Sequence, residues 1–329
     1  MKVYCLWKKN IGSIAVIGPN ADMMYNQLGD YTAPQEREEI VTVLDGIRKA
    51  VSPSTKVNYV KGCAIRDVTT SNIPAAVEAA RAADAVVLVV GGSSARDFKT
   101  KYIGTGAADV SNDGNQLLSD MDCGEGYDRS TLRLLGDQEK LLEAVAAIGK
   151  PLVVIYIQGR TLNMNLASEK AQALLTAWYP GEQGGTAIAD VLFGDYNPAG
   201  RLPVSVPRSE GQLPLFYSQG KQRAYVEEEA TPLYAFGYGL SYTKFDYSQL
   251  ELQKGNGKDV LQTVSCTVTN TGDCDGEEVV QLYICDKVAS VSQSPILLKA
   301  FERISLKKGE SKKVIFTLGE ESCLFIIWK

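Results

Sequence analysis

The sequence of 329 residues contains no histidine. Serine–histidine and cysteine–histidine catalysis, and metal sites built on imidazole, are therefore excluded. Chemistry in this chain has to rely on carboxylates, tyrosine, lysine or cysteine. The seven cysteines are dispersed and form no C-x-x-C pair, which favours free thiols over a disulfide framework or a zinc site. We expect neither a metal nor another cofactor.

Several other features are missing. No apolar run approaches the ~18 residues that a membrane helix needs, so a membrane is not an expected partner. A net charge of −5 without a cluster of Lys and Arg argues against nucleic acid. The turn Gly18-Pro19-Asn20 lacks the G-x-G-x-x-G spacing of dinucleotide-binding proteins. The first ten residues are too short and too polar for a signal peptide, which leaves the compartment unknown.

The length favours two domains, and the pattern changes from about residue 195. Residues 12–205 alternate between apolar runs and helical periodicity, which predicts an α/β domain with a mostly parallel open sheet and helices on both faces. The run at residues 85–90 is apolar at every position, as expected for a strand buried on both faces. The expected strands are 13–17, 56–60, 85–90, 152–157 and 173–178, and the expected helices are 39–51, 73–83, 137–149 and 183–193.

Residues 206–244 are rich in turn signals and predict an extended linker, and residues 245–329 alternate in short β-runs. The expected strands are 247–252, 261–269, 278–284, 297–304 and 312–318. They predict an all-β sandwich of the immunoglobulin or fibronectin type III kind, in which about seven strands are usual. The apolar tail 323–329 is either an improvised last strand or the remnant of a truncation.

The longest irregular stretch runs from Gly91 to Asp137. Structureless loops of this length are usually functional, and open α/β sheets bind ligands at the carboxyl ends of their strands. Glu125 lies between two glycines, which let the backbone turn sharply and present the carboxylate. We therefore expect any chemistry at Glu125, although a solvated loop carboxylate fits the spacing alone.

Five segments together resemble the C-terminal half of glycoside hydrolase family 3 enzymes, over about residues 12–318. They are residues 14–21, Gly124-Glu125-Gly126-Tyr127-Asp128-Arg129, residues 179–185, residues 197–203 and residues 236–245. The resemblance implies a retaining β-glucosidase or β-xylosidase type of enzyme, built as an α/β sandwich domain followed by a fibronectin type III-like domain. In such enzymes a (β/α) barrel precedes both domains and supplies the nucleophilic aspartate, and a loop glutamate, matched here by Glu125, is the general acid/base.

The sequence departs from this pattern because no barrel is present. The expected partners are therefore a β-linked oligosaccharide or glycoside and a separate (β/α) barrel chain, and the isolated chain is expected to be inactive. Retaining hydrolysis needs two carboxyl groups about 5–5.5 Å apart, and this chain would supply one. A non-catalytic fragment that binds carbohydrate or protein is the alternative, and a split or frameshifted gene would explain either.

Other residues of the segment have weaker expectations. Asp122 is the rival of Glu125 as the acid, and Tyr127 is expected to cover the acid and bind substrate. Asp128 and Arg129 are expected to be structural, forming an ion pair at the loop base. Glu182 is expected to complement the dipole of the helix that follows it. The loop residues Arg96, Asp97, Lys99 and Lys101 are candidates for substrate contacts, with a solvated charged loop as the alternative.

Overall fold

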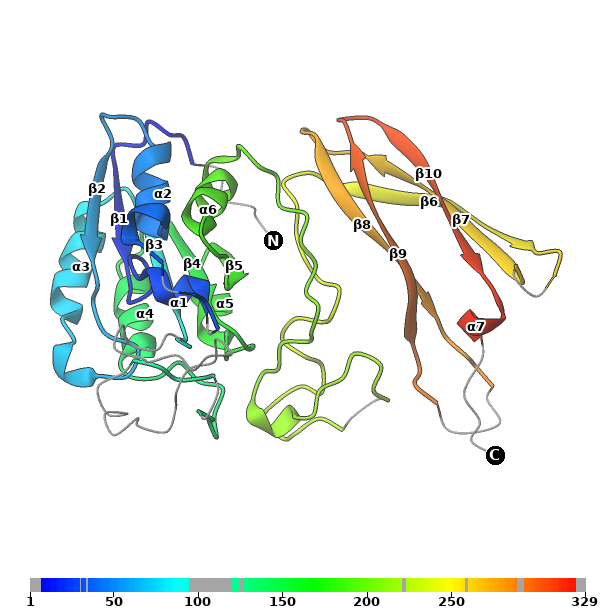
Figure 1. Ribbon diagram of the computed structural model, residues 1–329, viewed down its shortest axis with the longest axis horizontal. Coiled ribbons are helices and arrows are strands. Elements are labelled where there is room, and N and C mark those ends of the chain that lie inside the picture. The colour runs from blue at the N-terminus through cyan, green and yellow to red at the C-terminus, as the bar shows by residue number, and fades with distance from the viewer. Residues whose placement is uncertain are drawn as a thin grey trace. The chain divides into compact units, whose positions relative to one another are not determined.

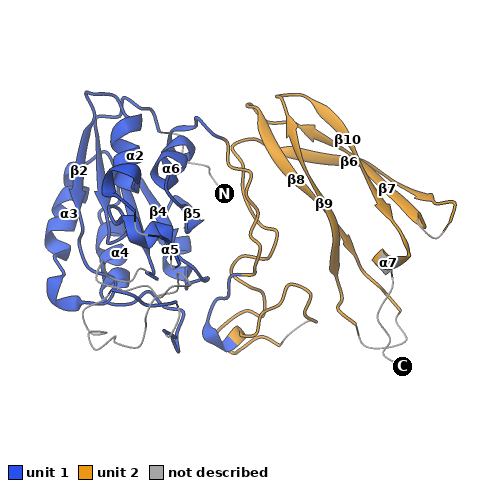
Figure 2. Cartoon of the chain, in the orientation of Figure 1, with its two compact units in different colours: residues 1–196, 206–211 blue, residues 197–205, 212–329 orange. Residues whose placement is uncertain are grey.

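The computed structural model describes residues 7–29, 31–33, 35–94, 120–124, 127–220, 223–257, 260–288 and 293–323. The chain divides into two compact units (Figure 2), of which the first comprises residues 1–196 and 206–211 and the second residues 197–205 and 212–329. The linker at 206–244 and the domain limits near residues 205 and 245 stay predictions.

The first unit is built on five parallel strands in the order β2-β1-β3-β4-β5 (Figure 1), which confirms the predicted α/β class. Every residue of β3 and of β4 is buried, because helices cover both faces of the sheet. The strands are β1 Ser13–Ile17, β2 Lys56–Val60, β3 Ala85–Gly91, β4 Leu152–Ile157 and β5 Ala173–Trp178.

The helices follow capping signals that are visible in the sequence. Thr42 begins α2 with a capping box, in which its hydroxyl accepts from the amide of Asp45 and the Asp45 carboxylate accepts from the amide of Thr42. Asn72 caps α3 by accepting from the amide of Ala75. The helices are α1 Met24–Leu28, α2 Val43–Ala50, α3 Ile73–Ala82, α4 Gln138–Ala146, α5 Asn165–Lys170 and α6 Gly184–Phe193, with one-turn 3₁₀ segments at Arg37–Glu39, Val68–Thr70 and Glu210–Gln212.

One helix start and one helix cap differ from the sequence prediction. The helix expected from residue 39 begins at Val43, because a separate 3₁₀ turn ends at Glu39 and the chain is extended at Ile40. Asp137 precedes α4 as predicted but makes no capping hydrogen bond. Its carboxylate instead accepts from the Ser71 hydroxyl at 2.8 Å and pairs with Lys140 at 2.8 Å.

The direction of the chain across the sheet divides the helices between its two faces. The step from β1 to β2 runs opposite to the steps from β2 to β3, β4 and β5. Right-handed crossovers therefore place α2 on one face and α3, α4 and α5 on the other. Helix α6 packs against α2. Their backbones are so close that a Cβ at Gly185 would lie 1.8 Å from the carbonyl oxygen of Thr42.

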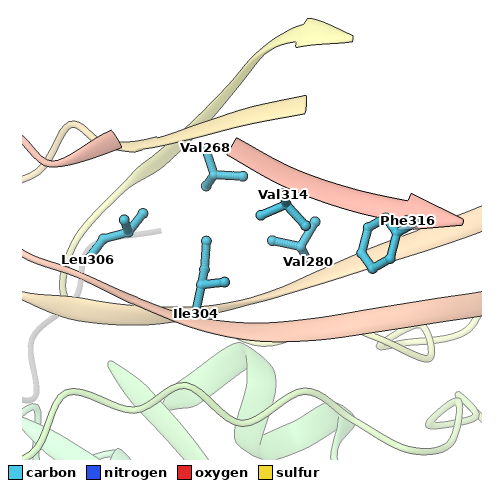
Figure 3. Packing of buried hydrophobic residues seen from close by; sticks show 6 residues of the cluster. All are labelled: Val268, Val280, Ile304, Leu306, Val314 and Phe316. Atoms are coloured by element: carbon cyan, nitrogen blue, oxygen red, sulfur yellow. The ribbon is translucent and has the colours of Figure 1, made fainter. Parts of the chain in front are cut away.

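The second unit holds two antiparallel sheets, β10-β7-β6 and β8-β9, which confirms the predicted β-sandwich. Figure 3 shows its core, where Val268, Val314 and Phe316 of the first sheet meet Val280, Ile304 and Leu306 of the second. The elements are β6 Phe245–Lys254, β7 Gln262–Asn270, β8 Gly276–Ile284, β9 Leu297–Leu306, β10 Ser311–Leu318 and α7 Glu320–Cys323.

Five cysteines among the described residues carry free thiols, in agreement with the dispersed spacing. They are Cys63, Cys123, Cys266, Cys274 and Cys285. Burial raises the pKa of the Cys63 thiol to about 12, so that this group stays protonated at neutral pH. Within the described ranges, no helix combines the length and the apolar character required to span a membrane.

Candidate active site

The strand order reverses between β1 and β3, and this switch point is where open α/β sheets bind ligands. At the carboxyl end of β1 lies the buried Asn20, whose Nδ2 donates to the carbonyl of Gly92 just beyond β3 at 3.1 Å. One side chain therefore joins the two strand ends that define the switch point.

A chain of buried side-chain hydrogen bonds continues from Asn20. Asn26 Nδ2 donates to Asn20 Oδ1 at 2.6 Å, and Ser93 Oγ donates to Asn26 Oδ1 at 2.6 Å. All three residues are less than 5% exposed. Buried polar groups that satisfy one another in this way fix a unique local geometry.

Asp122 joins the far end of the long loop to this network. The amide of Ser93 donates to Asp122 Oδ1 at 2.6 Å, and the amide of Asp122 donates to the carbonyl of Ser93 at 2.7 Å. A Cβ at Gly92 would lie 2.7 Å from Asp122 Oδ1, so glycine is required for this close approach. The loop thus returns to the strand end that it left.

Arg129 forms a buried ion pair with the same carboxylate. Its Nη1 lies 2.6 Å from Asp122 Oδ2, with the two side chains 5% and 2% exposed, and its Nη2 donates to the carbonyl of Arg133. Removing either partner would leave an uncompensated charge in a desolvated site. The pair therefore ties Arg129 to Asp122, which is itself bound to Ser93 just beyond β3.

The turn that carries the predicted acid is closed between these anchors. The amide of Tyr127 donates to the carbonyl of Gly124 at 3.1 Å, and the two residues form an isolated antiparallel bridge. Gly124 has a φ of 126°, which strongly favours glycine. Glu125 itself lies outside the described residues, as do Arg96, Asp97, Lys99 and Lys101.

The predicted ion pair between Asp128 and Arg129 is wrong, because the Arg129 guanidinium turns inward to Asp122. The Asp128 side chain is 95% exposed and lies 3.5 Å from Arg160. Its carboxylate accepts from the backbone amide of Arg129 at 2.8 Å, and this bond, followed by Arg160, lowers the pKa of Asp128. Asp122, the rival acid, has both oxygens engaged and is only 5% exposed, which favours a structural role.

Two contacts near the segment have no counterpart in the sequence patterns. Cys123 Sγ lies 3.4 Å from the hydroxyl of Tyr179, which follows β5, and burial raises the pKa of both groups. The Glu210 carboxylate accepts from the Thr131 hydroxyl at 2.6 Å and from the amide of Leu132. Only the position of Tyr179 directly after a strand could have indicated its proximity.

The remaining candidates occupy less central places. Tyr127 is partly exposed beside the Gly124 bridge. Glu182 precedes Gln183, the residue before α6, and its carboxylate accepts from the Gln183 side chain at 3.2 Å. Glu182 thus lies just before α6, and the first turn of the helix itself contains no acidic residue. No group of three or more Cys, Asp or Glu suited to a metal occurs in the part of the chain that the structure describes.

Comparisons with known proteins identify the domains that this chain carries. Residues 5–242 match the glycosyl hydrolase family 3 C-terminal domain, and residues 278–326 match the fibronectin type III-like domain. A β-xylosidase of Formosa agariphila is 42% identical over 94% of this chain and 41% of its own length. A periplasmic β-glucosidase of Salmonella typhimurium is 37% identical over 96% of this chain and 42% of its own length.

Solved structures show the same relationship. A β-glucosidase from Erythrobacter marinus superposes with a TM-score of 0.80 at 35% identity, over 97% of this chain and 43% of its own length. A β-glucosidase from Listeria innocua in complex with glucose gives a TM-score of 0.79 at 30% identity, over 96% and 41%. The chain therefore spans about two fifths of the length of these relatives, and it belongs to glycoside hydrolase family 3, whose C-terminal domain and fibronectin type III-like domain it carries.

Proposed function

We propose that this chain supplies the general acid/base, Glu125, of a retaining β-glycoside hydrolase of the β-glucosidase or β-xylosidase type. The observation that carries the proposal is the buried pair of Asp122 and Arg129, which anchors the Gly124–Tyr127 turn at the switch point of the sheet. The relatives named above are β-xylosidases and β-glucosidases, which supports a β-glycoside as the substrate.

The second part of the proposal concerns the nucleophile. A lone acid without a nucleophile and a sugar pocket lacks the positioning and charge stabilisation that supply most of the rate enhancement. The isolated chain should therefore hydrolyse nothing measurable. A (β/α) barrel on a separate chain would supply the nucleophilic carboxylate and the glycone pocket, with Arg96, Asp97, Lys101 and Tyr127 contributing contacts to the leaving group.

Reconstitution tests both parts. The portion of the Formosa agariphila β-xylosidase that this chain does not match is produced separately and mixed with this chain, and hydrolysis of aryl β-xyloside and aryl β-glucoside is followed. The same portion mixed with the relative's own C-terminal portion serves as the positive control for two-chain assembly. Activity that requires both chains and is lost with Glu125→Gln, but not with Glu182→Gln, supports the proposal.

Two outcomes oppose it. Robust turnover by this chain alone would contradict the need for a barrel. Equal activity of the Glu125→Gln mixture and the wild-type mixture would contradict the role of Glu125. The second candidate is a non-catalytic binding role. It is favoured if the positive control is active, the mixture containing this chain is inactive, and this chain still binds oligosaccharide.

A further inference from the structure

Strand β5, at the edge of the parallel sheet (Figure 1), ends in an irregular step. Its pairing with β4 skips Ala177, which is an extra residue between the paired Thr176 and Trp178. Trp178 has a φ of 53°, in the left-handed region that bulky residues rarely adopt. Bulges re-aim the side chains that follow them and are frequent beside active sites, where backbone strain is also concentrated. The side chain that directly follows this bulge is Tyr179.

The ring of Tyr179 lies directly against two glycines. A Cβ at Gly29 would be 2.6 Å from the ring Cδ2, and a Cβ at Gly159 would be 2.3 Å from the hydroxyl oxygen. Gly29 also has a φ of 87°, a backbone conformation that strongly favours glycine. The space for this aromatic ring therefore depends on glycine at two positions that are far apart in the sequence.

The hydroxyl of Tyr179 reaches the segment that leads into the candidate turn. It lies 3.4 Å from Cys123 Sγ, and the same thiol donates to the carbonyl of Ser93 at 3.7 Å. Since the thiol proton is directed to Ser93, the Tyr179 hydroxyl is the donor to the sulfur. Ser93 lies just beyond β3 and Tyr179 just beyond β5, so the buried Cys123 joins the strand ends on either side of β4.

This contact lies one residue before the turn. Gly124 begins the turn and directly follows Cys123. The preceding Asp122 is already held at the end of β3 by the amide of Ser93. The contact with Tyr179 adds an attachment at the end of β5. Two attachments to different strands fix the direction in which the chain enters the turn, whereas one alone would let the segment pivot.

We propose that Tyr179 is a positioning residue of the hydrolysis reaction, whose hydroxyl holds Cys123 and thereby sets how the Gly124–Tyr127 turn presents the acid. The inference rests on the function proposed above for Glu125. Burial raises the pKa of the Tyr179 hydroxyl, so that this group stays protonated and remains a donor at neutral pH. Tyr179 acts through Cys123 and transfers no proton to the substrate.

Hydrogen exchange tests the attachment without any measurement of activity. Tyr179→Phe keeps the ring and removes only the hydroxyl. The amides of Cys123 and Tyr127, which both donate to backbone carbonyls, should then exchange with deuterium about fivefold to tenfold faster, the equivalent of one neutral hydrogen bond. Tyr156→Phe is the matched control, because Tyr156 is 1% exposed and its hydroxyl donates to the carbonyl of Asn163 at 3.2 Å. It should leave both amides unchanged.

The kinetics of the reconstituted enzyme test the positioning of the acid. Tyr179→Phe should lower kcat for a β-linked disaccharide about fivefold to tenfold with little change in KM. It should leave the first-turnover release of dinitrophenol from a dinitrophenyl glycoside unchanged, whereas a merely structural role would slow both reactions. Cys123→Ala removes the same contact from the other side and should have the same effects. The double variant should be no slower than either single variant, because the hydroxyl acts through the thiol.

Two results would overturn the proposal. The first is unchanged exchange of the two amides in both Tyr179→Phe and Cys123→Ala. The second, in a mixture whose activity requires Glu125, is an equal effect of Tyr179→Phe on the disaccharide and on the dinitrophenyl glycoside. A wild-type mixture without any activity that depends on Glu125 would instead overturn the proposed function and, with it, the catalytic part of this inference. The exchange result would then still decide whether Tyr179 holds the turn.

Discussion

The pairing of Asp122 with Arg129 decides the geometry of the candidate site at the scale of single residues. We expect Arg129→Ala to lower the free energy of unfolding by about 3–5 kcal/mol, because the Asp122 carboxylate would remain buried without its partner. Arg133→Ala is the control, since Arg133 pairs with Glu139 but is 66% exposed, and it should cost less than about 1 kcal/mol. Denaturant unfolding measures both, and equal losses would show that the buried pair has no special role.

The lowered pKa of Glu210 predicts how the free energy of unfolding depends on pH. The hydroxyl of Thr131, followed by the amide of Leu132, lowers the pKa of Glu210 below its usual 4.5. A carboxylate whose pKa is depressed by folding contributes stability above its unfolded pKa, and this contribution disappears as the pH falls through the folded pKa. In Glu210→Gln, which accepts hydrogen bonds without titrating, the free energy of unfolding should fall less below pH 4.5 than in the wild type. An identical acid dependence of both proteins would refute this assignment.

At the scale of elements, the contact of α2 with α6 depends on two glycines. A Cβ at Gly185 would lie 1.8 Å from the Thr42 carbonyl oxygen, and a Cβ at Gly46 would lie 2.0 Å from the Gly185 carbonyl oxygen. Gly185→Ala should therefore force the helices apart and destabilise the first unit by at least about 1–3 kcal/mol. Gly200→Ala is the control, because a Cβ there meets no atom within 4 Å. Thermal unfolding compares the two, and similar midpoints would contradict the close packing.

The strands were predictable from the sequence because burial on both faces leaves a continuous apolar run, as in β3 and β4. The short helices α1 and α5 were missed, because five or six residues are too few to show a helical period. The site was predictable only as a loop at a strand end. The sequence does not predict that Arg129 pairs with Asp122 rather than with its neighbour Asp128, because this pairing depends on how the segment folds back onto Ser93.

At the scale of the whole molecule, the chain matches about two fifths of the length of its relatives. Its α/β unit carries the anchored turn. We expect the purified chain alone to give no hydrolysis of aryl β-xyloside or aryl β-glucoside above the rate of the Glu125→Gln variant. Turnover that follows the protein through successive purification steps and disappears with Glu125→Gln would show that the chain needs no separate barrel chain.

The central claim is that Glu125 donates a proton to the leaving group, and the dependence of rate on the leaving group tests it most directly. In the reconstituted enzyme, Glu125→Gln should slow the hydrolysis of a β-linked disaccharide by about 10²–10⁴-fold, the usual contribution of a general acid. In the first turnover, the same variant should release dinitrophenol from a dinitrophenyl glycoside nearly as fast as the wild type. This step forms the glycosyl-enzyme, and the leaving group needs no proton to depart. An equal loss on both substrates, or no loss on either, would contradict the account.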